Sequence, residues 1–267
     1  MTATLSPDLV TLDTARSAPV APAIAVRELT KRFATDKSRP PVLDRIDLTL
    51  EPGEFVCLLG ASGCGKSTLL SLLADLDRPS GGTLEVAGGR PALMFQEPAL
   101  LPWLTAVQNV ELALRLRGIG RAERADEARR LLSLVHLEDA ADRRPHQLSG
   151  GMRQRVALAR ALAQDARVLL MDEPFAALDA LTRDVLHVEL TRLWERTGLT
   201  VLFVTHNVRE AVRLGQRVCL MSSRPGRIVA EYAVDIPGER RIEDRRVSDL
   251  AVWITERLEA EVARHGR

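Results

Sequence analysis

The spacing of hydrophobic and polar residues divides the chain into segments that predict strands and helices. Residues 24–29 and 42–50 alternate apolar with polar positions, which is typical of strands that bury one face. Continuous apolar runs predict buried strands at 54–59, 168–171 and 200–205. Shorter strands are expected at 83–86, 217–222 and 227–234, and residues 93–96 form another apolar run that ends on a polar residue.

Helical spacing occupies most of the remaining chain. Helices are predicted at 69–74, 105–118, 121–137, 153–163, 181–197 and 209–214. Buried strands that alternate with helices indicate an α/β fold around a parallel sheet. The block from about 97 to 148 has helical spacing and no strand pattern, so we expect an inserted helical subdomain there.

The two ends of the chain differ from the part between them, which we expect to form one domain over 24–237. Residues 1–23 hold three prolines and many small residues, and they predict a disordered leader. Residues 238–267 form a charged tail. Within it Ser248 is a candidate cap for a terminal helix, either docked or dangling, with apolar residues at spacing four.

Composition then limits the class of protein. A chain of 267 residues with 46% hydrophobic residues can form one large domain with a subdomain. The net charge of +1 gives no sign of a nucleic-acid partner. Three cysteines argue against a disulfide framework and fit a reducing cytosol. No apolar run approaches the roughly 20 residues of a membrane span, so membrane contact is expected to go through a partner.

Candidate chemistry begins in a glycine-rich segment that fits G-x-x-x-x-G-K-[ST] at every fixed position. Its residues are Gly60, Ala61, Ser62, Gly63, Cys64, Gly65, Lys66, Ser67 and Thr68. The segment lies between a predicted strand and a predicted helix, as a phosphate-binding loop requires. The glycines let backbone N–H groups approach a polyphosphate, Lys66 supplies an ammonium, and Ser67 supplies a hydroxyl for Mg²⁺. The alternative is a glycine-rich turn with a chance lysine.

Two acidic residues follow the buried strand 168–171. Asp172 is expected beside the phosphate loop, where a carboxylate can hold the water shell of Mg²⁺. Glu173 is adjacent and can accept a proton from an attacking water. An Asp–Glu pair in isolation is also a common capping pair at the end of a strand.

A further motif, Ser149-Gly150-Gly151, opens the predicted helix 153–163. The Ser149 hydroxyl and the free N–H groups of the first turn can form an anion site, although a plain helix N-cap is the simpler alternative. With the phosphate loop and the acidic pair, this motif makes the sequence resemble the ATP-binding cassette (ABC) family over about 24–237. The resemblance implies a P-loop NTPase fold with a RecA-like parallel-sheet core, an N-terminal antiparallel β subdomain and an inserted helical subdomain.

The resemblance also implies roles for isolated residues. Gln96 matches a glutamine that senses Mg²⁺ and the attacking water, and Asp179 matches an aspartate at the dimer interface. His206 matches a switch histidine that contacts the γ-phosphate, although a lone histidine is more often structural. Phe33 matches the residue that stacks on adenine; a plain core aromatic is the alternative. The implied ligands are ATP and Mg²⁺, with Ser149, Gly150 and Gly151 acting on the opposite subunit of a homodimer.

Three local stretches, 97–103, 173–183 and 221–228, are similar to the nitrate/sulfonate/taurine importer ATPases of bacteria. This similarity implies an ATPase on the cytoplasmic face of the membrane, bound to a permease through about 97–103. A periplasmic or extracellular binding protein would then select the solute, with aliphatic sulfonates expected first and nitrate or taurine next. Leu101 and Trp103 would lie at the permease interface, or alternatively pack inside the helical subdomain.

Two other classes remain open at this point. A soluble cassette ATPase of DNA repair or translation usually carries two cassettes or long coiled-coil insertions, and this chain has one cassette and no heptad run. A small-molecule kinase would not need Ser149, Gly150, Gly151 or His206. Within the phosphate loop, the helix N-terminus is expected to favour the thiolate of Cys64 and make it reactive.

Overall fold

The computed structural model describes residues 21–33, 40–238, 240–241 and 244–265. The expected leader, 1–23, therefore lies outside the described residues except for its last three. In the part of the chain that the structure describes, every helix is too short or too polar to span a lipid bilayer.

The centre of the molecule is a six-stranded sheet in the order β5-β6-β7-β3-β8-β9. Its strands are β3 (Phe55–Gly60), β5 (Ala92–Met94), β6 (Val168–Asp172), β7 (Thr200–Thr205), β8 (Arg217–Met221) and β9 (Ile228–Ala233). All neighbouring strands pair in parallel except β8 and β9. The predicted parallel α/β core is confirmed. The carboxyl ends of β3, β6 and β7 meet at one edge, where ligands bind in open α/β sheets.

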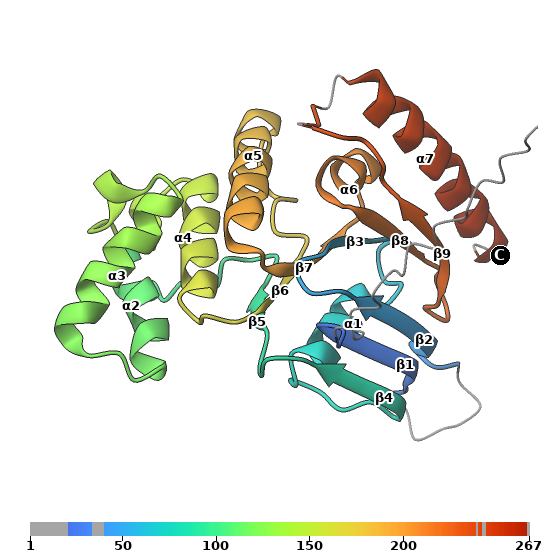
Figure 1. The fold of residues 1–267 in the computed structure, drawn as a ribbon, viewed down its shortest axis with the longest axis horizontal. Helices are drawn as coiled ribbons and strands as arrows, with labels where there is room; N and C mark the ends of the chain where they lie inside the picture. The colour runs from blue at the N-terminus through green and yellow to red at the C-terminus, as the bar shows by residue number, and fades with distance from the viewer. Residues whose placement is uncertain (1–20, 34–39, 239, 242–243, 266–267) are drawn as a thin grey trace, which may run out of the picture.

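A separate antiparallel sheet forms the N-terminal part, in the order β2-β1-β4. It consists of β1 (Ile24–Lys31), β2 (Leu43–Leu50) and β4 (Gly81–Val86). Helix α1 (Lys66–Leu73) shares a hydrophobic core with this sheet and with one face of the six-stranded sheet. Figure 1 shows α1 between the two sheets. The phosphate loop is therefore held between two β layers.

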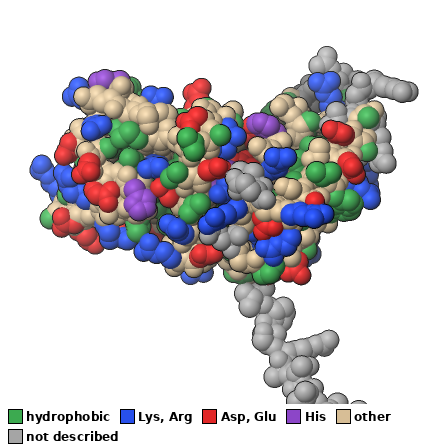
Figure 2. All heavy atoms as spheres, turned by 90° about the horizontal axis from the view of Figure 1, so that it is seen from above, with side chains coloured by type: hydrophobic (Ala, Val, Ile, Leu, Met, Phe, Trp, Pro, Cys, Tyr) green, Lys and Arg blue, Asp and Glu red, His purple; other side chains and the backbone are tan. Residues whose placement is uncertain are grey.

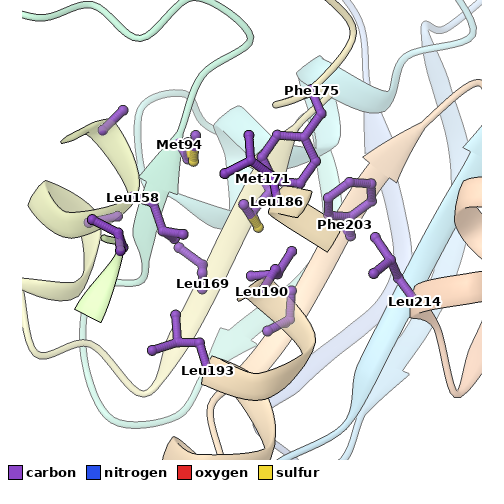
Figure 3. Packing of buried hydrophobic residues seen from close by; sticks show 14 of the residues in the cluster. Met94, Leu158, Leu169, Met171, Phe175, Leu186, Leu190, Leu193, Phe203 and Leu214 are labelled. Carbon is purple, nitrogen blue, oxygen red and sulfur yellow. The ribbon is translucent and has the colours of Figure 1, made fainter. Parts of the chain in front are cut away.

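The other face of the six-stranded sheet is covered by helices. Here α4 (Gly150–Leu162), α5 (Ala180–Thr197) and α6 (Val208–Leu214) enclose a second core. Figure 3 shows Leu186, Leu190 and Leu193 packed on side chains of β6 and β7. Alternate side chains of β3 point to opposite faces of the sheet. Phe55 and Cys57 lie in the core under these helices, whereas Val56 and Leu58 lie in the core shared with α1.

Helices α2 (Ala106–Leu116) and α3 (Arg121–Leu134) occupy the middle of the chain, as predicted, followed by 3₁₀ turns at Glu138–Ala140 and Pro145–Gln147. They pack on α4 at one end of the molecule (Figure 1). Thr105 begins α2 with a capping box, in which its hydroxyl accepts from Gln108 N and the Gln108 side chain accepts from Thr105 N.

The terminal helix differs from the prediction. Helix α7 (Arg245–His265) begins before Ser248, whose N–H donates to Asp244 O at 2.9 Å, so Ser248 lies inside the first turn and is not the cap. The helix is docked, because Val247, Ala251 and Ile254 are buried in the second core. The burial of Val247 explains why the helix starts earlier than its capping pattern indicates.

Candidate functional site

The glycine-rich segment joins β3 to α1 as a tight loop. Gly63 and Gly65 have φ of +77° and +107°, a region that side chains with a Cβ rarely adopt. A Cβ on Gly65 would lie 2.6 Å from Leu43 Cδ2, and one on Gly60 would lie 2.8 Å from Cys64 Sγ. The backbone conformation therefore favours glycine at Gly65, and an added Cβ would also have to displace the buried Leu43 side chain.

A cavity of about 350 Å³ opens over this loop at the carboxyl edge of the sheet. It brings together residues that lie more than 100 positions apart in sequence. Its lining consists of Val42, Ser62, Gly63, Gly65, Lys66, Ser67, Thr68, Gln96, Asp172 and Glu173. All but Val42 were expected from the sequence.

Lys66 is almost fully buried at the floor of this cavity. Its ammonium donates to Gly60 O at 2.8 Å and to Ala61 O at 3.1 Å. The same Nζ lies 3.6 Å from Glu173 Oε1. Since an ammonium has three donors, these contacts hold the charge beside the loop at the position where an anion would be bound.

Glu173 links this lysine to the predicted switch histidine. Its Oε2 lies 2.7 Å from His206 Nδ1, and its backbone N–H donates to Val204 O at 3.0 Å. The residue has φ of +43°, an uncommon value for a side chain with a Cβ. His206 is half exposed and does not line the phosphate-loop cavity, but it reaches that cavity's edge through Glu173.

Asp172 ends β6 next to Ser67. Burial raises the pKa of Asp172, whereas a hydrogen bond with Ser67 acts to lower it. The Ser67 hydroxyl, the Asp172 carboxylate and the Gln96 amide supply the oxygen ligands that Mg²⁺ prefers. Within the described ranges, no cluster of three or more His, Cys, Asp and Glu side chains could hold a metal alone. The donor set therefore fits a cation that is shared with phosphate oxygens.

Ser149 is the N-cap of α4, where its hydroxyl accepts from Met152 N at 3.2 Å. The side chain is exposed, and none of Ser149, Gly150 and Gly151 lines the phosphate-loop cavity of its own chain. Gly151 has another reason for being glycine, because a Cβ there would lie 2.3 Å from Thr182 Cγ2 on α5. The motif thus permits close contact of two helices and leaves the α4 N-terminus at the surface.

Comparison with known proteins agrees with this geometry. The family model described as ABC transporter matches residues 43–176. The nitrate import ATP-binding protein NrtD of Synechocystis sp. is 44% identical over 230 residues, which cover 84% of this chain and 86% of that protein. The chain belongs to the ABC transporter family.

Other relatives and solved structures support the assignment to the ABC family. The taurine import ATP-binding protein TauB of Pseudomonas aeruginosa is 47% identical over 210 residues, which cover 76% of this chain and 80% of that protein. A dimeric ATP-binding cassette in a post-hydrolysis state, bound to ADP and Pi, superposes with a TM-score of 0.70 at 32% identity. The match covers 80% of this chain and all of that one.

Other residues expected from the ABC resemblance lie outside the cavity. Asp179 is the N-cap of α5 and accepts from Thr182 N at 3.0 Å and from Thr182 Oγ1 at 2.7 Å; these hydrogen bonds lower its pKa. Phe33 is 67% exposed, so the core-aromatic alternative is wrong. The Lys31 ammonium lies 4.9 Å from the centre of the Phe33 ring.

The segment after Gln96 is held by α4 of this ABC protein, a feature that the sequence analysis missed. Gln154 Nε2 donates to Gln96 O at 2.9 Å. Arg160 donates to Pro98 O at 2.7 Å and to Ala99 O at 2.8 Å. Three carbonyls thus tie this segment to the helix that Ser149 begins.

Further along the same segment, Trp103 is 66% exposed and Leu101 is half-buried. Packing of Trp103 inside the helical part is therefore excluded.

The expectation for Cys64 is wrong. Its side chain is 1% exposed, and burial raises the pKa of the thiol, although the Lys66 ammonium acts to lower it. Cys57 and Cys219 are also free and buried. Packing against the loop thus outweighs the field of the helix N-terminus, and the thiolate is disfavoured.

Proposed function

We propose that this protein is the ATP-hydrolysing subunit of an ABC importer. The observation that carries the proposal is the single cavity in which Lys66, Ser67, Gln96, Asp172 and Glu173 meet. These groups come from three separate strand ends, and together they provide a cation for phosphates, oxygen ligands for Mg²⁺ and a base for water. Family membership supports the same activity.

Each group has a distinct task in the proposed reaction. Backbone N–H groups of Ser62 to Ser67 and the Lys66 ammonium bind the β- and γ-phosphates of ATP. Mg²⁺ would be held by Ser67, Asp172 and Gln96, and when bound it neutralises charge on the phosphate oxygens.

The remaining groups act on the attacking water. Glu173 accepts its proton as the water adds to the γ-phosphate, and His206 holds the Glu173 carboxylate in place. The Lys66 ammonium, 3.6 Å from Oε1, holds the other oxygen of the same carboxylate.

Two copies are proposed to complete each site. None of Ser149, Gly150 and Gly151 lines the phosphate-loop cavity of its own chain, and Ser149 is exposed at the N-terminus of α4. This N-terminus could therefore meet the γ-phosphate bound by a second chain. Phe33 would stack on adenine, and Asp179 would lie near the dimer interface. The dimeric cassettes among the solved relatives support this arrangement.

The importer role rests on the relatives and on one surface. The relatives act in import of nitrate and taurine, so the proposed cargo is a small anion, with aliphatic sulfonates, taurine and nitrate as candidates. Exposed Trp103 on the 97–103 segment is the proposed contact for a membrane permease, which would place the protein on the cytoplasmic face of the membrane. A periplasmic or extracellular binding protein would deliver the solute.

No nucleic-acid partner is proposed. Acidic and basic side chains are spread together over the visible face of the molecule (Figure 2), as the net charge of +1 leads one to expect. A soluble, non-transport ABC ATPase is the competing class. Stimulation of ATP hydrolysis by DNA or ribosomes would favour that class over the importer.

The composite site is tested by mixing two inactive variants. Lys66→Ala removes the ammonium of the phosphate loop, and Ser149→Arg places a bulky side chain at the N-terminus of α4. A mixed dimer retains one site free of both changes, so mixing should restore ATP hydrolysis that neither variant has alone. Activity of wild-type protein as a dilute monomer would refute the composite site.

The cargo is tested in cells. Deletion of the gene should abolish growth with sulfonates or taurine as the sole sulfur source, or with nitrate as the sole nitrogen source. Normal growth on all of them would exclude these cargoes.

A further inference from the structure

A chain of buried polar side chains connects α5 to the end of β7. His187 on α5 is 1% exposed, and its Nε2 lies 2.6 Å from Glu210 Oε1 on α6. The other oxygen of Glu210 accepts from the Thr205 hydroxyl. The Nδ1 of His187 lies 3.3 Å from Arg213 Nη1, which also donates to Asp184 at 2.7 Å.

The chemistry of Arg213 determines the proton position on His187. A guanidinium can only donate, so His187 Nδ1 must accept from Arg213. The Nε2 of His187 then carries a hydrogen and donates a hydrogen bond to Glu210 Oε1. Each buried group in the chain has the partner it needs, which is how a buried polar network becomes rigid.

The chain ends on the two neighbours of His206. Thr205 donates to Glu210 and accepts from Asn207 N at 3.0 Å. The Asn207 side chain accepts in turn from Glu210 N at 3.2 Å. The turn that presents His206 is therefore held from both sides by the carboxylate and the backbone of Glu210.

Helix α5, which carries His187, also contacts the segment that follows Glu173. Arg183 and His187 are four residues apart on one face of α5, and the N-cap Asp179 lies four residues before Arg183. Arg183 donates to Phe175 O at 3.2 Å and to Leu178 O at 2.7 Å. Helix α5 thus contacts the segment after Glu173 through Arg183 and the segment after His206 through His187.

We propose that His187 is a positioning residue for ATP hydrolysis. It orients Glu210, which holds the Thr205–Asn207 turn so that His206 stays 2.7 Å from Glu173. His187 does not line the phosphate-loop cavity and acts only through His206. This inference rests on the proposed ATPase function and adds a buried residue, 19 positions before the histidine it positions.

A double-mutant cycle tests the proposal on the full-length protein. His187→Leu removes both hydrogen bonds, whereas His187→Gln keeps them, because an amide can donate to Glu210 and accept from Arg213. We expect His187→Leu to lower kcat about tenfold, as a misplaced catalytic group does, and to leave KM for ATP within about twofold. His187→Gln should restore kcat. In a His206→Ala background, His187→Leu should cause no further loss.

Three results would overturn the inference in a protein whose wild type hydrolyses ATP. They are a wild-type kcat in His187→Leu, a Gln variant no better than Leu, and losses that add fully in the double variant. If His187→Leu does not fold, Thr205→Val breaks the same chain next to His206 at nearly constant volume and replaces it in the cycle. A wild-type protein without ATPase activity would instead overturn the proposed function itself.

Discussion

Glu173 Oε2 lies 2.7 Å from His206 Nδ1, while Oε1 of the same carboxylate lies 3.6 Å from Lys66 Nζ. The Glu173 carboxylate, which we propose as the general base, is therefore held between His206, the residue that follows β7, and the Lys66 ammonium of the phosphate loop. Both contacts fix the orientation of the carboxylate that would accept the proton of the attacking water.

Loss of the histidine contact should reduce turnover more than binding. We expect His206→Ala to lower kcat about 10²-fold, since an unheld general base loses most of its contribution, with little change in KM. His206→Gln can still donate to Glu173 Oε2 and should retain more activity than Ala. Steady-state kinetics of the three proteins checks this, and an Ala variant that matches Gln would contradict the positioning of Glu173 by His206.

Gly65→Ala tests the close packing of the phosphate loop. The added Cβ would lie 2.6 Å from Leu43 Cδ2 at φ of +107°, so the variant should lose ATP binding and about 2 kcal/mol or more of unfolding free energy. Gly118→Ala is the matched control, because its φ is +83° but no atom lies within 4 Å of the added Cβ. The control should lose only about 1 kcal/mol and bind ATP normally. Equal losses in chemical denaturation would contradict a packing role.

Arg160 should control the mobility of the segment after Gln96. Arg160→Met keeps an unbranched apolar stem but leaves Pro98 O and Ala99 O without this donor. Hydrogen exchange of backbone amides over 97–101 should accelerate about tenfold or more, as lost local stability of about 1.4 kcal/mol implies. Arg117→Met, which breaks a comparable bond to Ala163 O at 3.0 Å, should leave this segment unchanged. Unchanged exchange in Arg160→Met would show that the segment is held by other contacts.

The buried cysteines predict a pH dependence of stability. Burial raises the pKa of Cys219 to about 12. The folded state then keeps the thiol proton when the unfolded chain, with its ordinary thiol pKa, has already lost it. This contribution is fully present below the ordinary pKa of about 8.5 and is lost as the pH rises toward 12. Denaturation of Cys219→Ala should show a shallower loss of stability between pH 9 and 11 than wild type. The same slope in both proteins would contradict it.

The local parts of the site could be predicted from sequence, because their signals lie within a few residues of each other. The strand, loop and helix around Gly60–Thr68 follow from an apolar run, three glycines and a helix former. The acidic pair at the end of β6 was placed correctly for the same reason, since parallel strands end at one edge.

The long-range parts could not be predicted, because they depend on which elements pack together. Gln154 lies 58 residues from Gln96, and His187 lies 23 residues from Glu210. At Cys64 a local rule gave a wrong prediction. The helix N-terminus predicted a reactive thiol, but tertiary packing buries the side chain. At Ser248 the burial of Val247 outweighed the capping preference.

Substitutions of the two acidic residues at the end of β6, Asp172 and Glu173, should have different effects on ATP binding and hydrolysis. Glu173→Gln keeps the size of the side chain and can still accept from His206, but an amide is a poor base, so ATP should bind and not be hydrolysed. Asp172→Asn should instead weaken the binding of Mg²⁺ beside Ser67, because it removes the only charged oxygen of the three proposed ligands.

Gel filtration of Glu173→Gln with and without MgATP is the most direct test of the proposed ATP site shared between two chains. Because the proposed ATP site is shared between two chains and cannot turn over in this variant, the protein should elute as a dimer with MgATP and as a monomer without it. Asp172→Asn should remain monomeric in both conditions. A Glu173→Gln protein that binds ATP yet stays monomeric, or that hydrolyses ATP at the wild-type rate, would contradict the account.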